Sequence, residues 1–493
     1  MRGGVITMTM SAGASDFATY RPATGELFAT YPVTTAAEVS QKIAKARASA
    51  KWWAELAYNE RRKILLKWNS LLVAKLDEAV ELIVAESGKP VSDATLEATL
   101  ACEHVAWAAQ NAHLYLRVHR RSPGLLMANM SAQVDRVPYG VVGVIGPWNY
   151  PIFTPMGSIA YALAAGNTVI FKPSEFTPAI GLWLEKTMRE VVPEHELLQV
   201  ITGAGAVGAS LIALGVDKIS FTGSTATAKK VAAACVERMI PFVLECGGKD
   251  PVLVDSDADL ERAADQTLWS GMANAGQSCI GAERVYVHEK VAERFLEKLR
   301  EKASEIQAGI SYGAATRPAQ IDIIKAHVDD ALNRGTGLVG DRTSVGHRLV
   351  GPVIITNVPE DAPSMREETF GPVLIVNTVQ NMDEAIAKAN DTSFGLAASV
   401  WSKRNGEKIA ANLHCGMVSI NSVFTFAAIG SLPFGGVKDS GMGRIHGPEG
   451  LLEFTYPRSI VKPRFNLPLE FTSFKRSAFA DKVITTLGRI RHK

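Results

Sequence analysis

Cysteine is scarce in this sequence and lacks the spacing of a disulfide framework or a zinc site. The 493 residues include five cysteines, an odd and scattered set without a CxxC pair: Cys102, Cys235, Cys246, Cys279 and Cys415. Disulfide scaffolds are dense in paired cysteines, and structural zinc sites need closely spaced pairs. The pattern argues against both classes, and since no His pair has ligand spacing either, we predict no metal. It favours a reducing compartment, which we expect to be the cytoplasm.

An excess of charge of either sign is absent as well. Lys and Arg total 52 and Asp and Glu total 50, which leaves a net charge of +2. Nothing in this balance indicates nucleic acid, so we predict no such partner. Hydrophobic residues at 47% and charged residues at 21% are typical of a soluble globular protein. A chain of 493 residues is too long for one core, so we expect two or three domains.

A continuous membrane span is also lacking. Residues 137–171 contain no charged side chain and are long enough to cross a bilayer. However, this stretch contains four prolines that would break a continuous helix, Pro138, Pro147, Pro151 and Pro155. We therefore predict a buried strand, loop, helix and strand. The first fifteen residues carry one Arg and no apolar core, which indicates an irregular start rather than a signal peptide.

From Gly140 the sequence alternates between short apolar runs and helix-length segments. The expected strands are Val141–Ile145, Thr168–Phe171, Leu198–Ile201, Lys218–Phe221 and Phe242–Leu244. The expected helices between them are Pro155–Ala165, Pro178–Val192, Ala206–Leu214 and Ala226–Met239. This alternation predicts parallel βαβ units, hence an α/β fold with ligands beyond the carboxyl ends of the strands.

A second set of strands and helices is expected from Asp250 onward, after a boundary near Gly247-Gly248. It comprises helices near Asp259–Ala273 and Lys290–Ala308, and strands near Gly351–Thr356 and Val373–Val376. The connection Ser311–Leu349 is Gly-rich and is expected to be irregular. Upstream, helical spacing covers Thr34 to about Val84 and Ser92 to Leu116, and Val118–Arg136 favours a hairpin.

Glu245 and Cys279 form the candidate reactive pair. Each lies near the end of an expected strand and close to glycine. A thiol can attack an electrophile, and a carboxylate can activate the water that releases the intermediate. Placed on either side of the expected boundary, the two would face each other across a cleft. The alternatives are a small buried hydrophobe for Cys279 and a solvated strand end for Glu245.

Seven motifs give the sequence a resemblance to the aldehyde dehydrogenase superfamily, of the NAD(P)-dependent, non-acylating type. The resemblance runs from about Tyr20 to about Val461. The motifs occur in the family's order: PWNYP (147–151), KPSE (172–175), FTGST (221–225), LECGGK (244–249), GQSC (276–279), EETFGP (367–372) and PFGGVKDSG (433–441).

The resemblance implies a Rossmann-like parallel-sheet cofactor domain, a second α/β catalytic domain and a small β oligomerisation hairpin. We accordingly divide the chain into an NAD-binding domain (1–118 and 140–246), a catalytic domain (247–447), an oligomerisation segment (119–139 and 448–470) and a basic C-terminal tail (471–493). A homodimer or homotetramer is expected.

The resemblance also implies the chemistry, oxidation of an aldehyde to a carboxylic acid. Cys279 would be the nucleophile, and the Asn149 side chain with the Cys279 backbone N–H would form an oxyanion hole. Glu245 would activate water to hydrolyse the resulting thioester. Relatives that pass the acyl group to coenzyme A generally lack this Glu, so its presence favours a free acid as product.

The cofactor residues implied by the resemblance are Trp148, Lys172, Glu175, Gly223, Ser224, Glu368 and Phe370. The turn Gly223-Ser224-Thr225 would hold the pyrophosphate at a helix N-terminus. A carboxylate at Glu175 would repel a 2′-phosphate, so NAD is favoured and NADP is the alternative. The formal GxGxxG at Gly203–Gly208 lacks an acidic strand end about twenty residues later, so we interpret it as a tight turn or a minor adenine contact.

The expected substrate pocket is apolar and roomy. It comprises Tyr150, Phe153, Gly157, Ile280 and Phe434, with Phe424 and Phe426 nearby. Succinate-semialdehyde relatives tend to place Arg at the positions of Gly157 and Ala273, and neither is Arg here. Aromatic or longer aliphatic aldehydes are therefore favoured over succinate semialdehyde. The aromatics could equally be ordinary core, and a non-catalytic protein on the same fold is the alternative from another class.

Beyond Val461 the resemblance fades and the sequence becomes basic. Residues 462–493 carry eight Lys and Arg against Glu470 and Asp481. Phe479, Val483, Leu487 and Ile490 recur at helical spacing, which predicts a short basic amphipathic helix. One hypothesis is peripheral contact with an anionic membrane. The alternatives are a solvated tail and a tail packed on a neighbouring subunit.

Overall fold

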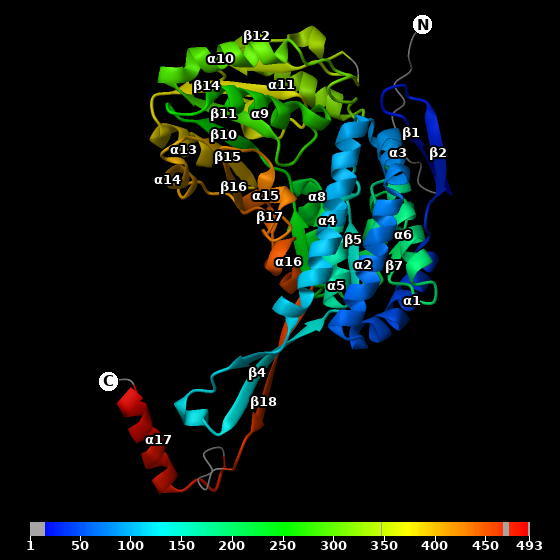
Figure 1. Cartoon of the computed structure of the whole chain (residues 1–493), viewed down its shortest axis with the longest axis vertical. Helices are drawn as coiled ribbons and strands as arrows, with labels where there is room; N and C mark the ends of the chain where they lie inside the picture. Colours follow the sequence, from blue (N-terminus) through cyan, green and yellow to red (C-terminus); the bar gives the residue numbers. More distant parts are fainter. Residues whose placement is uncertain (1–14, 347, 467–472, 492–493) are drawn as a thin grey trace.

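Two largely parallel sheets form the two halves of the molecule, and a third, smaller sheet extends from them as an arm (Figure 1). The computed structural model describes residues 15–346, 348–466 and 473–491. The predicted irregular start falls almost wholly outside these residues. The α/β fold class predicted from the sequence is confirmed. No helix in the described residues is long and apolar enough to cross a membrane.

The first half is built on a six-stranded sheet in the order β17-β9-β8-β5-β6-β7, in which only β17 is antiparallel. The chain order reverses between β5 and β8, and sheets of this type bind ligands at such a switch point. All five predicted strands are present to within a residue, whereas β17 was not predicted. The bounds are β5 Val141–Ile145, β6 Thr168–Lys172, β7 Leu198–Val200, β8 Lys218–Thr222, β9 Phe242–Glu245 and β17 Gly441–Met442.

Helices cover both faces of this sheet, because successive strand residues point to opposite sides. Val142 and Val144 share a core with α2 to α6, whereas Val141 and Ile145 share one with α1, α7 and α8. A capping box between Thr35 and Glu38 starts α1. The bounds are α1 Ala36–Glu55, α2 Tyr58–Ala74, α3 Leu76–Ser87, α4 Val91–Leu116, α5 Phe153–Ala165, α6 Pro178–Val191, α7 Gly205–Ala213 and α8 Thr225–Glu237.

The second half is built on a seven-stranded sheet in the order β12-β13-β14-β11-β10-β15-β16, with β12 antiparallel at one edge. The strands are β10 Asp250–Val254, β11 Ala282–His288, β12 Thr336–Val339, β13 Val353–Thr356, β14 Val373–Val379, β15 Ala397–Trp401 and β16 Met417–Ile420. Their helices are α9 Leu260–Met272, α10 Glu289–Ala303, α11 Gln320–Arg334, α12 Pro363–Arg366, α13 Met382–Asn390 and α14 Gly406–Ala410.

The prediction that Ser311–Leu349 is irregular was wrong. This stretch contains α11 and β12, and Ile324, Val328 and Ala331 are buried on one face of the helix. The many glycines of Ser311–Leu349 suggested a loop, so the helical spacing of these three residues was overlooked. Helix α10 is also shorter than predicted, because it ends at Ala303 rather than Ala308.

The arm is a three-stranded antiparallel sheet in the order β18-β4-β3. The predicted hairpin corresponds to β3 His119–Arg121 and β4 Met130–Pro138, joined by the short helix η1 Leu125–Met127. Strand β18, Thr455–Pro463, pairs along the whole of β4. A hairpin near the N-terminus was not predicted. The remaining elements are β1 Asp16–Tyr20, β2 Leu27–Pro32, η2 Ala273–Gly276, η3 Arg342–Ser344, α15 Thr425–Ala428, η4 Lys438–Ser440, α16 Gly447–Glu453 and α17 Ala478–Arg491.

Asn167 links three elements where the arm meets the first half. Its side chain is fully buried. It donates to the carbonyl oxygens of Ala162 (3.0 Å) and Phe454 (2.9 Å) and accepts from the Gly140 N–H (2.9 Å). The end of α5, the start of β5 and the end of α16 are thereby joined through one amide. Buried backbone groups need such partners because water cannot replace them.

We expect Asn167→Ala to destabilise the protein by about 3 kcal/mol, because it leaves the Gly140 N–H and the Phe454 carbonyl without their partner. The midpoint of urea unfolding, followed by far-UV circular dichroism, measures the effect. Asn412→Ala is the matched control, since exposed Asn412 makes one bond to the Lys408 carbonyl within its own segment. Equal midpoints for the two variants would contradict the linking role.

Candidate active site

Loops from the two halves meet at the candidate site. Glu245 ends β9 of the first sheet, whereas Cys279 lies in the loop before β11 of the second. Their proximity is visible in the electrostatics, because the charges of Glu368, Asp250 and Glu245 all act on the Cys279 thiol. A Cβ built on Gly248 would lie 2.8 Å from the Cys279 carbonyl oxygen, so the segment between β9 and β10 passes directly beside the Cys279 loop.

The Cys279 thiol is in an environment that opposes ionisation. Burial is the largest effect and raises the pKa of the thiol far above its usual value, and the neighbouring carboxylates raise it further, Glu368 first. The loop before the thiol is conformationally special, since Asn274 and Ala275 have φ of 53° and 57°. Before a ligand binds, the nucleophile is therefore a thiol rather than a thiolate.

Asn149 is held against the nucleophile loop. It is 6% exposed, and its side-chain amide donates to the Gln277 carbonyl oxygen at 3.0 Å. The backbone carbonyl oxygen of Asn149 accepts hydrogen bonds from Lys89 Nζ (2.8 Å) and Asn274 Nδ2 (3.0 Å). The structure thus places Asn149 beside the loop that carries Cys279.

A buried ion pair that the sequence reasoning missed supports the Asn149 loop. Lys89 and Glu97 are in contact at 2.6 Å with side chains 0% and 1% exposed. Besides this pair, Glu97 accepts from the N–H groups of Ile152 (3.1 Å) and Phe153 (3.3 Å). The available signal was Glu97 itself, a charged residue within the buried alanine face of α4.

Glu245 is almost completely buried, and neither carboxylate oxygen has a hydrogen-bond partner among the described residues. Burial raises the pKa of this carboxyl well above its usual value, the charge of Arg444 lowers it, and that of Glu453 raises it. A Cβ on Gly435 would lie 2.6 Å from Glu245 Oε1 and 2.9 Å from Arg444 Cδ. Glycine at this position therefore leaves room for the carboxylate beside the arginine.

A second buried ion pair positions the loop that carries Glu368 and Phe370. Lys249 pairs with Glu283, which also accepts from the N–H groups of Thr369 (2.9 Å) and Phe370 (3.1 Å). Phe370 has φ of 51°, and its ring packs edge-on against Trp148 with centroids 5.5 Å apart. Glu368 packs on Gly247, and burial is the main cause that raises its pKa to about 8.

Four of the seven predicted cofactor residues lie at or just beyond the carboxyl ends of β6 and β8, namely Lys172, Glu175, Gly223 and Ser224. Lys172 Nζ is 3.5 Å from the Glu175 carboxylate. The Gly223 N–H donates to the Glu245 carbonyl oxygen (3.0 Å), so Gly223 has a structural role in this turn. Ser224 is exposed and caps the N-terminus of α8. The turn Gly203–Gly208 leads into α7, and a Cβ on Gly208 would lie 3.7 Å from Lys172.

The predicted pocket residues divide into two groups. Phe153 and Phe434 surround His446, with ring centroids 5.9 and 5.2 Å from the imidazole, and a side chain at Gly157 would overlap His446 Nε2. Ile280 and Cys279 pack on the edge of the same core. Tyr150 instead lies under Lys89, whose Nζ is 4.2 Å from the ring centroid.

His446 is a second residue that the sequence reasoning missed. It is 1% exposed, and neither ring nitrogen has a partner in the part of the chain that the structure describes. Burial, then the neighbouring His104, lowers its pKa well below the usual value, so the ring is neutral. It fills the volume that glycine at 157 leaves open.

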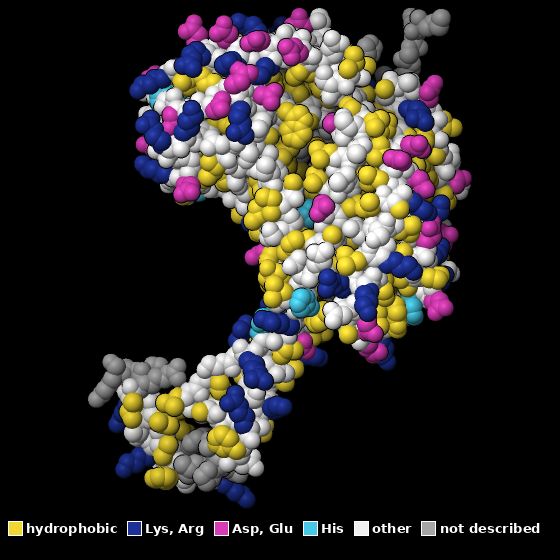
Figure 2. Space-filling model, in the orientation of Figure 1, with side chains coloured by type: hydrophobic (Ala, Val, Ile, Leu, Met, Phe, Trp, Pro, Cys, Tyr) yellow, Lys and Arg dark blue, Asp and Glu magenta, His cyan; other side chains and the backbone are white. Residues whose placement is uncertain are grey.

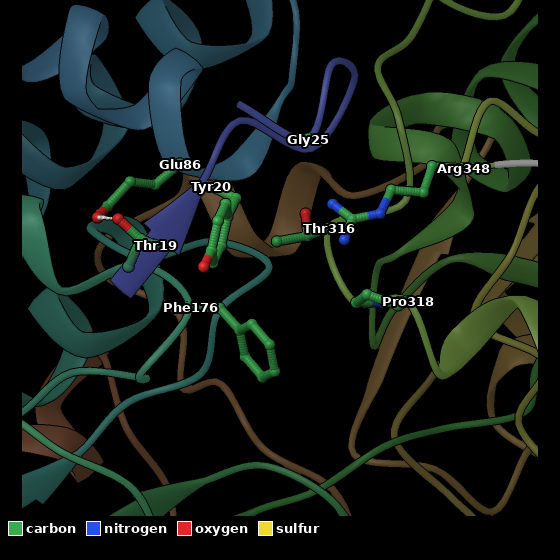
Figure 3. Close-up of a pocket in the computed structure, with 8 residues that line it drawn as sticks. All are labelled: Thr19, Tyr20, Gly25, Glu86, Phe176, Thr316, Pro318 and Arg348. Carbon is green, nitrogen blue, oxygen red and sulfur yellow. Dashed lines mark hydrogen bonds between the residues drawn. The ribbon is translucent and has the colours of Figure 1, made fainter. Parts of the chain in front are cut away.

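A separate cavity lies between the first hairpin and the second half (Figure 3). Glu86 Oε1 accepts from Thr19 (2.9 Å) and Tyr31 (3.0 Å) in its wall, and burial raises the pKa of Glu86 to about 7. Arg348 faces Tyr20 across the hollow. None of the predicted site residues lines this cavity.

Metal ligands and disulfides are not assembled in the described residues. No group of three or more His, Cys, Asp and Glu side chains is placed there to hold a metal ion, and all five cysteines are free.

Comparisons with known proteins agree on one family. The family described as "Aldehyde dehydrogenase family" matches residues 8–460. The chain is 38% identical to a 4,4'-diapolycopene aldehyde oxidase of Methylomonas sp, over 93% of this chain and 88% of that protein. It is 37% identical to a putative NADP(+) succinate-semialdehyde dehydrogenase of Mycolicibacterium smegmatis, over 90% and 87%. An NAD-dependent aldehyde dehydrogenase structure from Sinorhizobium meliloti superposes with a TM-score of 0.88 at 30% identity, covering 93% of each chain.

We expect Glu368→Gln to speed alkylation of Cys279 by iodoacetamide at pH 9. Above pH 8 the Glu368 carboxylate carries a charge that opposes thiolate formation, and removing it lowers the pKa of Cys279. A gain of about threefold to tenfold corresponds to half to one pKa unit. Mass spectrometry of the Cys279 peptide measures the rate.

Glu367→Gln is the matched control, because the adjacent Glu367 side chain is 73% exposed and is not among the charges that act on Cys279. It should react like the wild type. Unchanged or slower alkylation of Glu368→Gln would contradict the electrostatic account.

Proposed function

The chain belongs to the aldehyde dehydrogenase family, and from that premise we propose that it oxidises apolar aldehydes to free carboxylic acids with NAD as its preferred cofactor. Enzymes of this family act on aldehydes with NAD(P). The observation that carries the proposal is the convergence of Asn149, Glu245, Cys279 and Glu368 from both halves. With family membership shown, the non-catalytic alternative loses its support.

In the first step, Cys279 Sγ adds to the aldehyde carbon. The carbonyl oxygen becomes an oxyanion, which the Asn149 Nδ2 and the Cys279 N–H would stabilise as donors. One of the two hydrogens on Asn149 Nδ2 is already donated to the Gln277 carbonyl oxygen. This bond fixes the amide plane and therefore the direction of the second hydrogen. Because burial favours the neutral thiol, Sγ must pass its proton to water before or during attack.

In the second step, the thiohemiacetal loses hydride and becomes a thioester on Cys279. The nicotinamide of the bound cofactor supplies the hydride acceptor. Glu245 then takes a proton from the water that attacks the thioester carbon, and the acid leaves as the thiol is restored. Glu245 must be ionised to do this, so its raised pKa moves deacylation to higher pH, and the charge of Arg444 opposes that shift.

The residues present fit a dinucleotide. The exposed N-terminus of α8 suits the pyrophosphate, and Lys172 and Glu175 suit the ribose hydroxyls. Glu368, near the Cys279 thiol, suits the nicotinamide ribose. A carboxylate at Glu175 disfavours a 2′-phosphate, which supports NAD over NADP.

An apolar aldehyde suits the side chains around the thiol. Phe153, Phe434 and Ile280 are apolar, and Gly157 carries no side chain to bind a distal carboxylate. The diapolycopene aldehyde oxidase relative is named for an apolar aldehyde, whereas the M. smegmatis relative is named for succinate semialdehyde. Succinate semialdehyde is therefore the second candidate substrate.

Domain roles and assembly complete the proposal. We assign 1–118 and 140–246 to cofactor binding, 247–447 to catalysis, and 119–139 with 448–470 to oligomerisation, with 471–493 as a basic tail. The long β4–β18 pair gives the arm an extended surface on which a homodimer or homotetramer can assemble. Sedimentation at several concentrations distinguishes the two.

The test is NADH formation with hexanal, decanal, benzaldehyde, phenylacetaldehyde and succinate semialdehyde, in stopped flow and at steady state. We expect Glu245→Gln to keep a stoichiometric NADH burst while steady turnover falls by about 10²–10⁴-fold, because general base catalysis is lost after the thioester forms. Cys279→Ala should show neither burst nor turnover.

Glu449→Gln, an exposed acid on α16, is the control and should behave as wild type. A wild-type preference for succinate semialdehyde would overturn the substrate class but leave the mechanism standing. Loss of the burst in Glu245→Gln would contradict the assignment of Glu245 to deacylation.

For the cofactor, we expect Glu175→Gln to raise the ratio of kcat/KM with NADP to kcat/KM with NAD by about tenfold, since it removes a negative charge next to the ribose. Glu194→Gln, an exposed acid after α6, should leave the ratio unchanged. An unchanged ratio in Glu175→Gln would mean that the 2′-position of the adenosine ribose does not bind next to Glu175.

A further inference from the structure

The far end of the arm gathers exposed apolar side chains from three segments. We call this the arm tip and define it as residues 122–129, 461–466 and 473–491. Hydrogen bonds join the first two segments, since the Arg464 N–H donates to the Asn129 carbonyl oxygen at 2.7 Å. Figure 1 places α17 at the same end of the arm. The exposed apolar residues of the arm tip include Leu125 53%, Met127 43%, Val461 57%, Phe465 56%, Phe474 113%, Phe479 64% and Ile490 69%.

Positive charge surrounds these apolar residues. The described side chains of the arm, within 117–138, 455–466 and 473–490, include eleven Lys and Arg against two Asp. Both acids are already engaged, Asp135 with Arg458 and Asp481 with Arg476. Figure 2 shows dark blue side chains around the yellow ones on this lobe, with no magenta near the tip. Since the whole chain has a net charge of +2, the residues outside the arm together carry a net negative charge.

Helix α17 itself has the character of an interfacial helix. Ala480 is buried, while Phe479, Lys482, Arg489 and Ile490 are exposed. Apolar side chains next to cations on a short helix insert at the boundary between headgroups and acyl chains, and anionic lipids strengthen the binding.

We propose that the arm tip docks the enzyme on an anionic lipid surface. Apolar residues of η1, the end of β18 and α17 enter the interface, and the surrounding cations contact the headgroups. The paired strands β4 and β18 remain the surface on which copies of the chain assemble, whereas two arm tips meeting face to face would bring like charges together. The proposal does not depend on the reaction, but it would place an enzyme for apolar aldehydes where such molecules partition.

The experiment is flotation of the full-length protein with vesicles of phosphatidylcholine alone or mixed with phosphatidylglycerol. We expect binding to the mixed vesicles only, weakened by added salt as the charges are screened. Lys482→Glu/Arg489→Glu should reduce the bound fraction by about tenfold or more. Leu125→Ser/Met127→Ser, in the hairpin rather than the helix, should also reduce it.

Lys403→Glu/Lys408→Glu is the matched control, because it reverses two exposed cations of the second half and should float like the wild type. Benzaldehyde turnover without vesicles should be unchanged in every variant, which keeps this test separate from that of the catalytic residues. Absence of binding, or equal binding to neutral vesicles, would overturn the proposal. So would a fall in the sedimenting mass of the arm-tip variants, which would make the surface a contact between subunits.

Discussion

Burial of ionisable groups is the constraint on which the candidate site depends. Glu245 and Asp250 are buried and Cys279 and Glu368 are partly buried, and loss of solvent is the first cause that raises the pKa of each. A charge in such surroundings is costly unless it is partnered. The reactive groups are therefore mainly uncharged before a ligand binds. When one of them ionises during the reaction, a bound ligand or the nearby Arg444 must stabilise its negative charge.

Two buried ion pairs hold the segments around the site in place. Lys89–Glu97 holds the Asn149 loop, and Lys249–Glu283 holds the loop of Glu368 and Phe370. Glu97 satisfies backbone N–H groups at the start of α5, and Glu283 satisfies those of the loop at Thr369 and Phe370. A buried pair of this kind is costly to break, because removal of one partner leaves the other charge uncompensated. Both loops are thereby kept in place around a site whose own groups repel one another when ionised.

Local patterns predicted much of the fold. The five strands β5 to β9 and the helices between them follow from apolar runs of four or five residues separated by helix-length segments, and the structure agrees to within about two residues. Helix α11 was missed because it lies in a Gly-rich stretch, and β17 was missed because two residues carry no periodicity. Their assignment depends on neighbours distant in sequence, which packing supplies and propensity does not.

By itself, the sequence determined the α/β class, the order of the motifs and the residue types available for chemistry, because these follow from composition and local spacing. Only the tertiary structure decided which side chains share a location. Glu97 and Ile152, or His446 and Gly157, are far apart in the chain and meet because the helices α4, α5 and α16 pack together. The raised pKa values were likewise decided there, since burial is a property of the folded molecule and not of any motif.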